Sequence, residues 1–221
     1  LKGQVHLKDV LGANRVSAYG AQGAQGLTYN YAAKQVNEQI LSVMQELADE
    51  AQLTEKFTAL YEGEVINTGE KRKVLHHLLR GRLGKDVFYD TSAGTKNARD
   101  FYESQRKAIA DFARSVHSGK ITNEKGETFT TVVQIGIGGS DLGPRALYLA
   151  LEEWAKAHGT KKADAYFISN VDPDDASHVL TSCVKDLSRT LFILVSKSGT
   201  TQETLANELL VKDFLTEAGL N

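Results

Sequence analysis

The chain has 221 residues, of which 41% are hydrophobic and 24% are charged. Its 26 basic and 28 acidic side chains nearly balance, so no strong field exists to attract nucleic acid or an anionic membrane. Because domains average roughly 150 residues, one large domain or one domain with an appended piece is expected. The partner predicted by this composition is a small molecule.

The cellular compartment is indicated by the cysteine count and the first residues. The single Cys183 cannot form an intramolecular disulfide, and the chain opens without a signal-like apolar stretch, which indicates the cytoplasm. The uncharged stretch 128–140 is too short and too rich in glycine to span a bilayer. Since the chain begins with Leu1 and stops at Asn221 just after an expected helix end, we expect part of a longer protein.

Residues 1–118 are predicted to form a helical N-terminal segment. Apolar side chains recur there at helical spacing without a convincing strand between them. The loop expected in this segment, 81–96, is rich in Gly, Asp, Ser and Thr. The predicted helices cover, in chain order, 30–53, 55–61, 71–79 and 99–117.

After a polar break at 118–128 the pattern changes to strands alternating with helices. Nearly continuous apolar runs predict strands covered on both faces, at 131–137, 165–169 and 190–195. The helices that follow them are predicted at 145–159, 173–184 and 202–219. This order predicts an α/β fold over 119–221, with a doubly wound parallel sheet flanked by helices.

Each of these three helices has a start signal. Pro144 opens the first, and Asp172 followed by Pro173 reads as an N-cap with a first-turn proline. Thr200 with Glu203 three residues later predicts a capping box for the third.

Two unusual loops follow the first and third predicted strands: GIGGSDLGP at 136–144 and SKSGTT at 196–201. In parallel sheets, ligands bind beyond the carboxyl ends of the strands, where helix N-termini point. Glycines let backbone N–H groups approach closely, so both loops suit an anion. The second loop adds several hydroxyl donors that suit a terminal phosphate, although capping explains Thr200 alone, and Lys197 fits either solvent or a ligand.

Neither loop fits a nucleotide. The dinucleotide fingerprint starting at Gly136 needs a sixth-place glycine where Asp141 stands, and the acidic residue about 20 positions on is missing. Pro144 and Arg145 occupy the places where a P-loop needs Lys and Ser or Thr. No cofactor is therefore predicted.

The remaining chemistry-bearing side chains have structural interpretations. His76 and His77 are adjacent, so on a helix they diverge by about 100° and cannot share a metal ion. The acids within 172–175 fit helix capping, and Cys183 fits a small core residue without a partnering histidine motif. No metal site is predicted.

The two loops, GIGGSDLGP and SKSGTTQET, resemble those of the glucose-6-phosphate isomerase family. The similarity extends in order over 66–81, 118–144 and 167–175, and the S-x-S-G-x-T core is also similar to the phosphosugar loop of the wider sugar-isomerase (SIS) domain family. The resemblance implies an SIS-type sheet over 119–221 and interconversion of glucose 6-phosphate and fructose 6-phosphate. It also implies a homodimer for the full-length protein, with active sites completed across the subunits.

The resemblance also implies residue roles. Around the sugar it places Gly139 and Ser140, and around the phosphate it places Ser196, Lys197, Ser198, Thr200 and Thr201. This chain departs from many family members in having Ser198 for Thr and Gly199 for Phe; the hydroxyl is kept and the aromatic ring is lost.

The family's catalytic base, acid and cations come from later motifs, including a G-G-R-F-S stretch, that are missing from this sequence. The resemblance therefore implies no catalytic residue in this fragment and no turnover by it alone. One alternative stays open: a non-catalytic SIS module that senses a phosphosugar and regulates a partner, which the second loop alone would permit.

Overall fold

The structure is a computed structural model and describes residues 5–220. It divides into two compact units, Leu1–Ser104 and Gln105–Asn221, and the division falls within the long helix α5 (Ala98–His117). The domain boundary at residue 118 stays a prediction.

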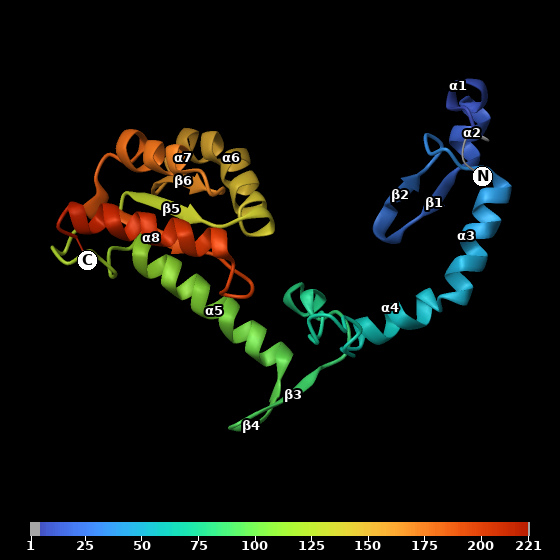
Figure 1. Cartoon of the computed structure of the whole chain (residues 1–221), viewed down its shortest axis with the longest axis horizontal. Coiled ribbons are helices and arrows are strands. Elements are labelled where there is room, and N and C mark those ends of the chain that lie inside the picture. The colour runs from blue at the N-terminus through green and yellow to red at the C-terminus, as the bar shows by residue number, and fades with distance from the viewer. Residues whose placement is uncertain (1–4, 221) are drawn as a thin grey trace. The chain divides into compact units, whose positions relative to one another are not determined.

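The first unit contains short helices and two antiparallel hairpins (Figure 1). Its helix α3 begins after Asn37, whose side-chain oxygen accepts a hydrogen bond from the Ile40 N–H at 2.9 Å. In chain order its elements are α1 (Leu7–Val10), α2 (Ala13–Ala18), β1 (Gly20–Gln22), the 3-10 turn η1 (Ala24–Gly26), β2 (Thr28–Asn30), α3 (Glu38–Glu50), α4 (Leu53–Tyr61), the 3-10 turn η2 (His76–Leu79), β3 (Phe88–Thr91), β4 (Gly94–Asn97) and the start of α5.

Several predictions for this unit were wrong. The hairpins β1–β2 and β3–β4 interrupt a segment expected to be helical, and β3–β4 lies largely in the expected loop 81–96. Their strands have three or four residues, none of them buried, so no apolar run marks them in the sequence. The helix expected over 71–79 is only the single turn η2, and the first long helix is shorter than 30–53.

The buried apolar cluster of this unit is small. It consists of Leu75, Leu78, Val87 and Ala98, with Tyr89 and Tyr102 packed against it. The cluster ties η2 to the β3–β4 hairpin and to the start of α5, where the Ala98 N–H donates to the Val87 carbonyl oxygen at 2.8 Å.

The second unit is built on a three-stranded parallel sheet, as predicted. The strand order is β6-β5-β7, with the first strand in the chain at the centre. Its elements are β5 (Thr131–Ile135), the 3-10 turn η3 (Gly138–Ser140), α6 (Leu142–Ala157), β6 (Asp164–Ile168), α7 (Pro173–His178), the π-helical turn η4 (Val179–Cys183), the 3-10 turn η5 (Leu187–Arg189), β7 (Thr190–Leu194) and α8 (Gln202–Glu217).

Side chains alternate between the two faces of this sheet. On one face, Val133, Ile135 and Ile168 are fully buried against α7, η4 and Val211 of α8, which lies along β5 (Figure 1). On the other face, the Phe167 ring contacts α6, with the Tyr148 ring centroid at 6.0 Å. Helices therefore cover both faces, and the fold is α/β.

The helix starts confirm one capping prediction and correct another. The Asp172 carboxylate accepts from the N–H groups of Asp174 and Asp175 at 3.0 and 3.3 Å, so it caps α7 as expected. The capping box at Thr200 was wrong, because the N-cap of α8 is Thr201 and its side chain makes no capping bond. Helix α6 begins at Leu142, which leaves Pro144 in the first turn, where a proline is tolerated.

Candidate functional site

The two glycine- and hydroxyl-rich loops leave neighbouring strands at the same edge of the sheet. Strands β5 and β7 pair in parallel, with Ile135 opposite Leu194, and the Val195 N–H extends the ladder by donating to the Ile135 carbonyl oxygen at 2.9 Å. The first loop starts at Gly136 and the second at Ser196, so they begin side by side.

Gly136 permits the close approach of these loops. It is buried, and a Cβ atom at this position would lie 3.0 Å from the Ser140 Cβ and 3.1 Å from the Val195 carbonyl oxygen. Both distances are shorter than side chains tolerate without displacing a neighbour. Glycine here therefore lets the Ser140 turn lie directly against the start of the second loop.

The first loop is a 3-10 turn. The Ser140 N–H donates to the Ile137 carbonyl oxygen at 3.1 Å, and the Asp141 N–H donates to that of Gly138 at 3.0 Å. Gly138 has a φ of +55°, in the left-handed region that favours glycine. Gly139 is exposed, with open space where a Cβ would lie, and Ser140 is partly exposed. The two predicted sugar-side residues thus stand together at the surface of the turn.

The second loop is held by its own hydroxyl groups. Ser196 Oγ accepts from the Gly199 N–H at 3.0 Å and lies 3.0 Å from Thr201 Oγ1. Ser198 Oγ accepts from the N–H and the hydroxyl of Thr200, at 3.1 and 3.0 Å.

These bonds gather the hydroxyls of the second loop at the N-terminus of α8. Gly199 has a φ of +73°, so a larger residue in this conformation would be strained. Lys197 is exposed in the same loop. The loop therefore offers donors and the positive end of a helix dipole to an anion.

Sequence reasoning missed two polar residues that support the first loop. Gln134 Nε2 donates to the Ser140 carbonyl oxygen at 2.9 Å. The Asp141 carboxylate is buried and pairs with Arg145, whose Nε lies 3.0 Å away and whose guanidinium lies over the Phe167 ring. The available signal was a single amide side chain in a strand that is apolar after Thr131.

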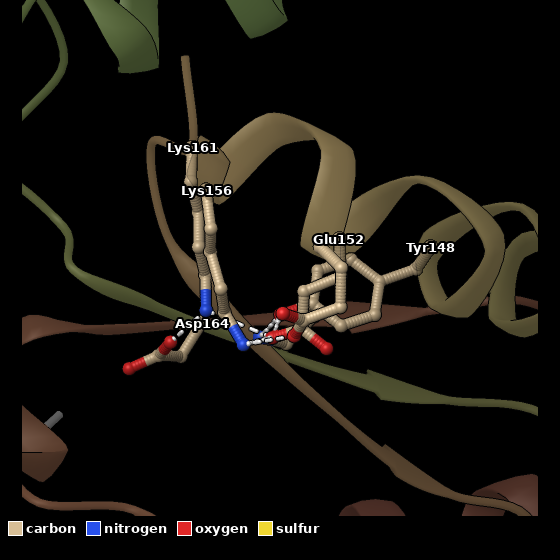
Figure 2. A network of polar contacts seen from close by, with 7 residues as sticks. Tyr148, Glu152, Lys156, Lys161 and Asp164 are labelled. Atoms are coloured by element: carbon tan, nitrogen blue, oxygen red, sulfur yellow. Dashed lines mark hydrogen bonds and ion pairs between the residues drawn. The ribbon is translucent and has the colours of Figure 1, made fainter. Parts of the chain in front are cut away.

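A second polar cluster lies at the start of β6 and so at the other end of the sheet. Figure 2 shows Lys161 between two carboxylates, with Nζ 2.9 Å from Glu152 Oε1 and 2.5 Å from Asp164 Oδ1. Hydrogen bonds from Lys161, Lys156 and Tyr148 hold the pKa of the Glu152 carboxyl at about 2. Tyr148 also accepts from the Ala165 N–H at 3.1 Å, so the cluster covers an edge of β6 and stands apart from the two loops.

The histidines and acids do not form a metal centre in the described part of the chain. Among residues 5–220, no group of three or more His, Cys, Asp or Glu side chains is placed to hold a metal ion. The His77 ring stacks on Tyr61 with centroids 4.2 Å apart, and His76 is exposed. Cys183 is half-buried in η4. No helix within residues 5–220 has the length and apolar character needed to cross a membrane.

Comparison with known proteins shows the family to which this chain belongs. A family model described as phosphoglucose isomerase matches residues 30–221, which is most of the chain and includes both loops. The chain belongs to the phosphoglucose isomerase family. The resemblance predicted from the loops is confirmed at the level of the family.

Curated members of the phosphoglucose isomerase family align with nearly all of the chain. It is 56% identical over 207 residues to a glucose-6-phosphate isomerase of Treponema denticola, covering 94% of this chain and 38% of the relative. It is 46% identical over 215 residues to that of Borreliella afzelii, covering 97% and 40%. For Desulfotalea psychrophila the identity is 42% over 212 residues, covering 93% and 37%. The chain therefore spans about two fifths of the length of these relatives.

Proposed function

We propose that this chain supplies the sugar-phosphate-binding part of a glucose-6-phosphate isomerase. The observation that carries the proposal is the side-by-side start of the two loops around Gly136, one rich in hydroxyls and one presenting Ser140. In the proposal, Ser196, Lys197, Ser198, Thr200 and Thr201 surround the phosphate, and Gly139 and Ser140 face the sugar.

The chemistry of a phosphate dianion supports these roles. It accepts several hydrogen bonds, and each bond to a charged group contributes about 1.5–3 kcal/mol net. The hydroxyls of Ser196 and Ser198 are engaged within their own loop, and a bound phosphate would replace those contacts with stronger, charge-assisted ones. The helix α8 adds its positive end to the same place.

The reaction proposed for the complete protein is the exchange of glucose 6-phosphate and fructose 6-phosphate through an enediol. This step needs a base, a ring-opening acid and positive charge near the oxyanion. The proposal assigns no catalytic residue to the present 221 residues, so the chain by itself is expected to bind weakly and not to isomerise.

The proposal includes an SIS-type doubly wound sheet and a cytoplasmic homodimer for the complete protein. The strand order β6-β5-β7 with helices on both faces supports the sheet topology, because such folds place a switch point beside the first strand. The relatives' shared name favours the isomerase over a phosphosugar-sensing regulatory module.

Binding of glucose 6-phosphate to the chain, followed by NMR titration, tests the proposal. We expect shifts in the amides of 136–141 and 196–204, and weaker binding in Ser196→Ala and Thr201→Ala. Thr216→Ala is the matched control, since it removes a hydroxyl at the other end of α8 that donates to the Lys212 carbonyl oxygen. Shifts confined to other parts of the chain, or equal effects of all three variants, would refute the assignment.

A further inference from the structure

Gln134 is a polar residue in β5, whose other residues after Thr131 are apolar. Its neighbours in β5, Val133 and Ile135, are fully buried, and Gln134 itself is half-buried on the opposite face. Burying an amide without a partner costs free energy, so its partner explains why the strand tolerates it. That partner is the Ser140 carbonyl oxygen, to which Nε2 donates at 2.9 Å.

The Ser140 peptide is held from three directions. Its N–H donates to the Ile137 carbonyl oxygen at 3.1 Å, and its carbonyl oxygen accepts from Gln134. Its Cβ and carbonyl oxygen lie against Gly136, 3.0 and 3.1 Å from where a Cβ would stand. With the backbone fixed in this way, the direction of the Ser140 side chain is set by rotation about one bond.

The two loops are fixed by different means. The second loop carries four hydroxyl groups, and all four take part in hydrogen bonds within the loop. The first loop has a single hydroxyl, that of Ser140. Besides the backbone hydrogen bonds of its turn, a side chain from outside the loop holds it, because Gln134 donates to the Ser140 carbonyl oxygen.

We infer that Gln134 is a positioning residue for sugar recognition, holding the Ser140 peptide so that its hydroxyl faces the bound sugar. This inference rests on the proposed function, in which Ser140 contacts the sugar and 196–201 contact the phosphate. It predicts that Gln134 affects the affinity for the sugar part of a ligand and leaves the phosphate part unaffected.

The test compares two ligands and two variants of the 221-residue chain. Q134M keeps the length of the side chain and removes the donor, and its dissociation constants for glucose 6-phosphate and inorganic phosphate are measured by NMR titration. We expect glucose 6-phosphate to bind roughly fivefold to tenfold more weakly, the equivalent of about one lost hydrogen bond, with phosphate unchanged. Should Q134M fail to fold, Q134L serves, since it is also apolar and removes the donor.

Y148F is the matched control, because it removes a hydroxyl that bonds to the Ala165 N–H and to Glu152 at the far end of the sheet. It should change neither affinity. If Q134M weakens the binding of both ligands equally, or of neither, the inference is wrong while the proposed function stands. If the unmodified chain binds neither ligand, the proposed function fails. Amide exchange at Ser140 and Asp141 then decides whether Gln134 fixes the turn: faster exchange in Q134M than in Y148F supports it, and equal exchange overturns it.

Discussion

The two units of the chain use their apolar side chains differently. In the second unit, Val133, Ile135 and Ile168 are fully buried between the sheet and its helices. In the first unit, α3 and α4 contain no buried residue among those described, and Leu47 and Phe57 are 64% and 63% exposed. Both helices are amphipathic. The contrast therefore teaches that a 3.6-residue pattern indicates a helix with an apolar face, and does not say whether other parts of this chain bury that face.

The sharpest test of this contrast removes one branched aliphatic side chain from each unit. Ile135→Ala should lower the free energy of unfolding by about 2–5 kcal/mol, because it leaves a cavity in a packed core. Leu47→Ala should change it by less than about 0.5 kcal/mol, because that side chain is already largely in water. Urea unfolding followed by circular dichroism measures both, and equal losses would show that the α3 face is covered in solution.

A smaller loss of stability is expected at the edge of the sheet where the two loops begin. Gly136→Ala should cost about 1–3 kcal/mol, because the new Cβ would press on the Ser140 turn and on the Val195 carbonyl oxygen. Gly139→Ala is the stability control, since open space surrounds its Cβ position. Thermal unfolding of the two variants checks this, and matching melting temperatures would contradict the close approach of the loops.

Helix caps should contribute similarly to the stability of both units, because a cap acts within its own helix and does not depend on how deeply the core is packed. Asp172→Ala at α7 and Asn37→Ala at α3 each remove an observed capping acceptor and should each cost about 1 kcal/mol. Hydrogen exchange at the first-turn amides of each helix is the measurement. A loss of stability for Asp172→Ala alone would mean that α3 does not form in this chain without further packing partners.

The smallest effect is expected from the half-buried ion cluster around Glu152, because its charged groups still reach solvent, which screens such pairs. The folded pKa of about 2 lies below the ordinary value of 4.5, so the cluster stabilises the fold above about pH 4.5. That stabilisation is lost as the pH falls from 4.5 toward 2, when the carboxyl is protonated in the folded state too. Glu152→Gln should therefore be less stable than the unmodified chain at pH 7 and should converge with it near pH 2. A difference that is constant with pH, in urea unfolding at several pH values, would exclude this origin.

The sequence was most informative where burial was deepest. The three strands at 131–137, 165–169 and 190–195 could be found because they are apolar at nearly every position, which is typical of strands covered on both faces. The expected full burial was wrong for β7, where Ile193 and Leu194 are exposed. The hairpins β1–β2 and β3–β4 could not be found, because their exposed strands leave no hydrophobic pattern. The cap at Asp172 could be predicted from the residues next to it in the chain. The same kind of prediction was wrong at Thr200, because its hydroxyl donates to Ser198 Oγ instead of capping the helix.

The amino-acid sequence by itself determined the order of strands and helices in the second unit, the two loops and the family to which they belong, because those features depend on residues close together in the chain. Only the tertiary structure decided that β5 is central and that Gly136 brings the Ser140 turn close to the Val195 carbonyl oxygen. It also decided that Gln134 donates to the Ser140 carbonyl oxygen and so supports the turn. These contacts depend on which strands pair and in which register, and that choice is made by the packing of the whole sheet.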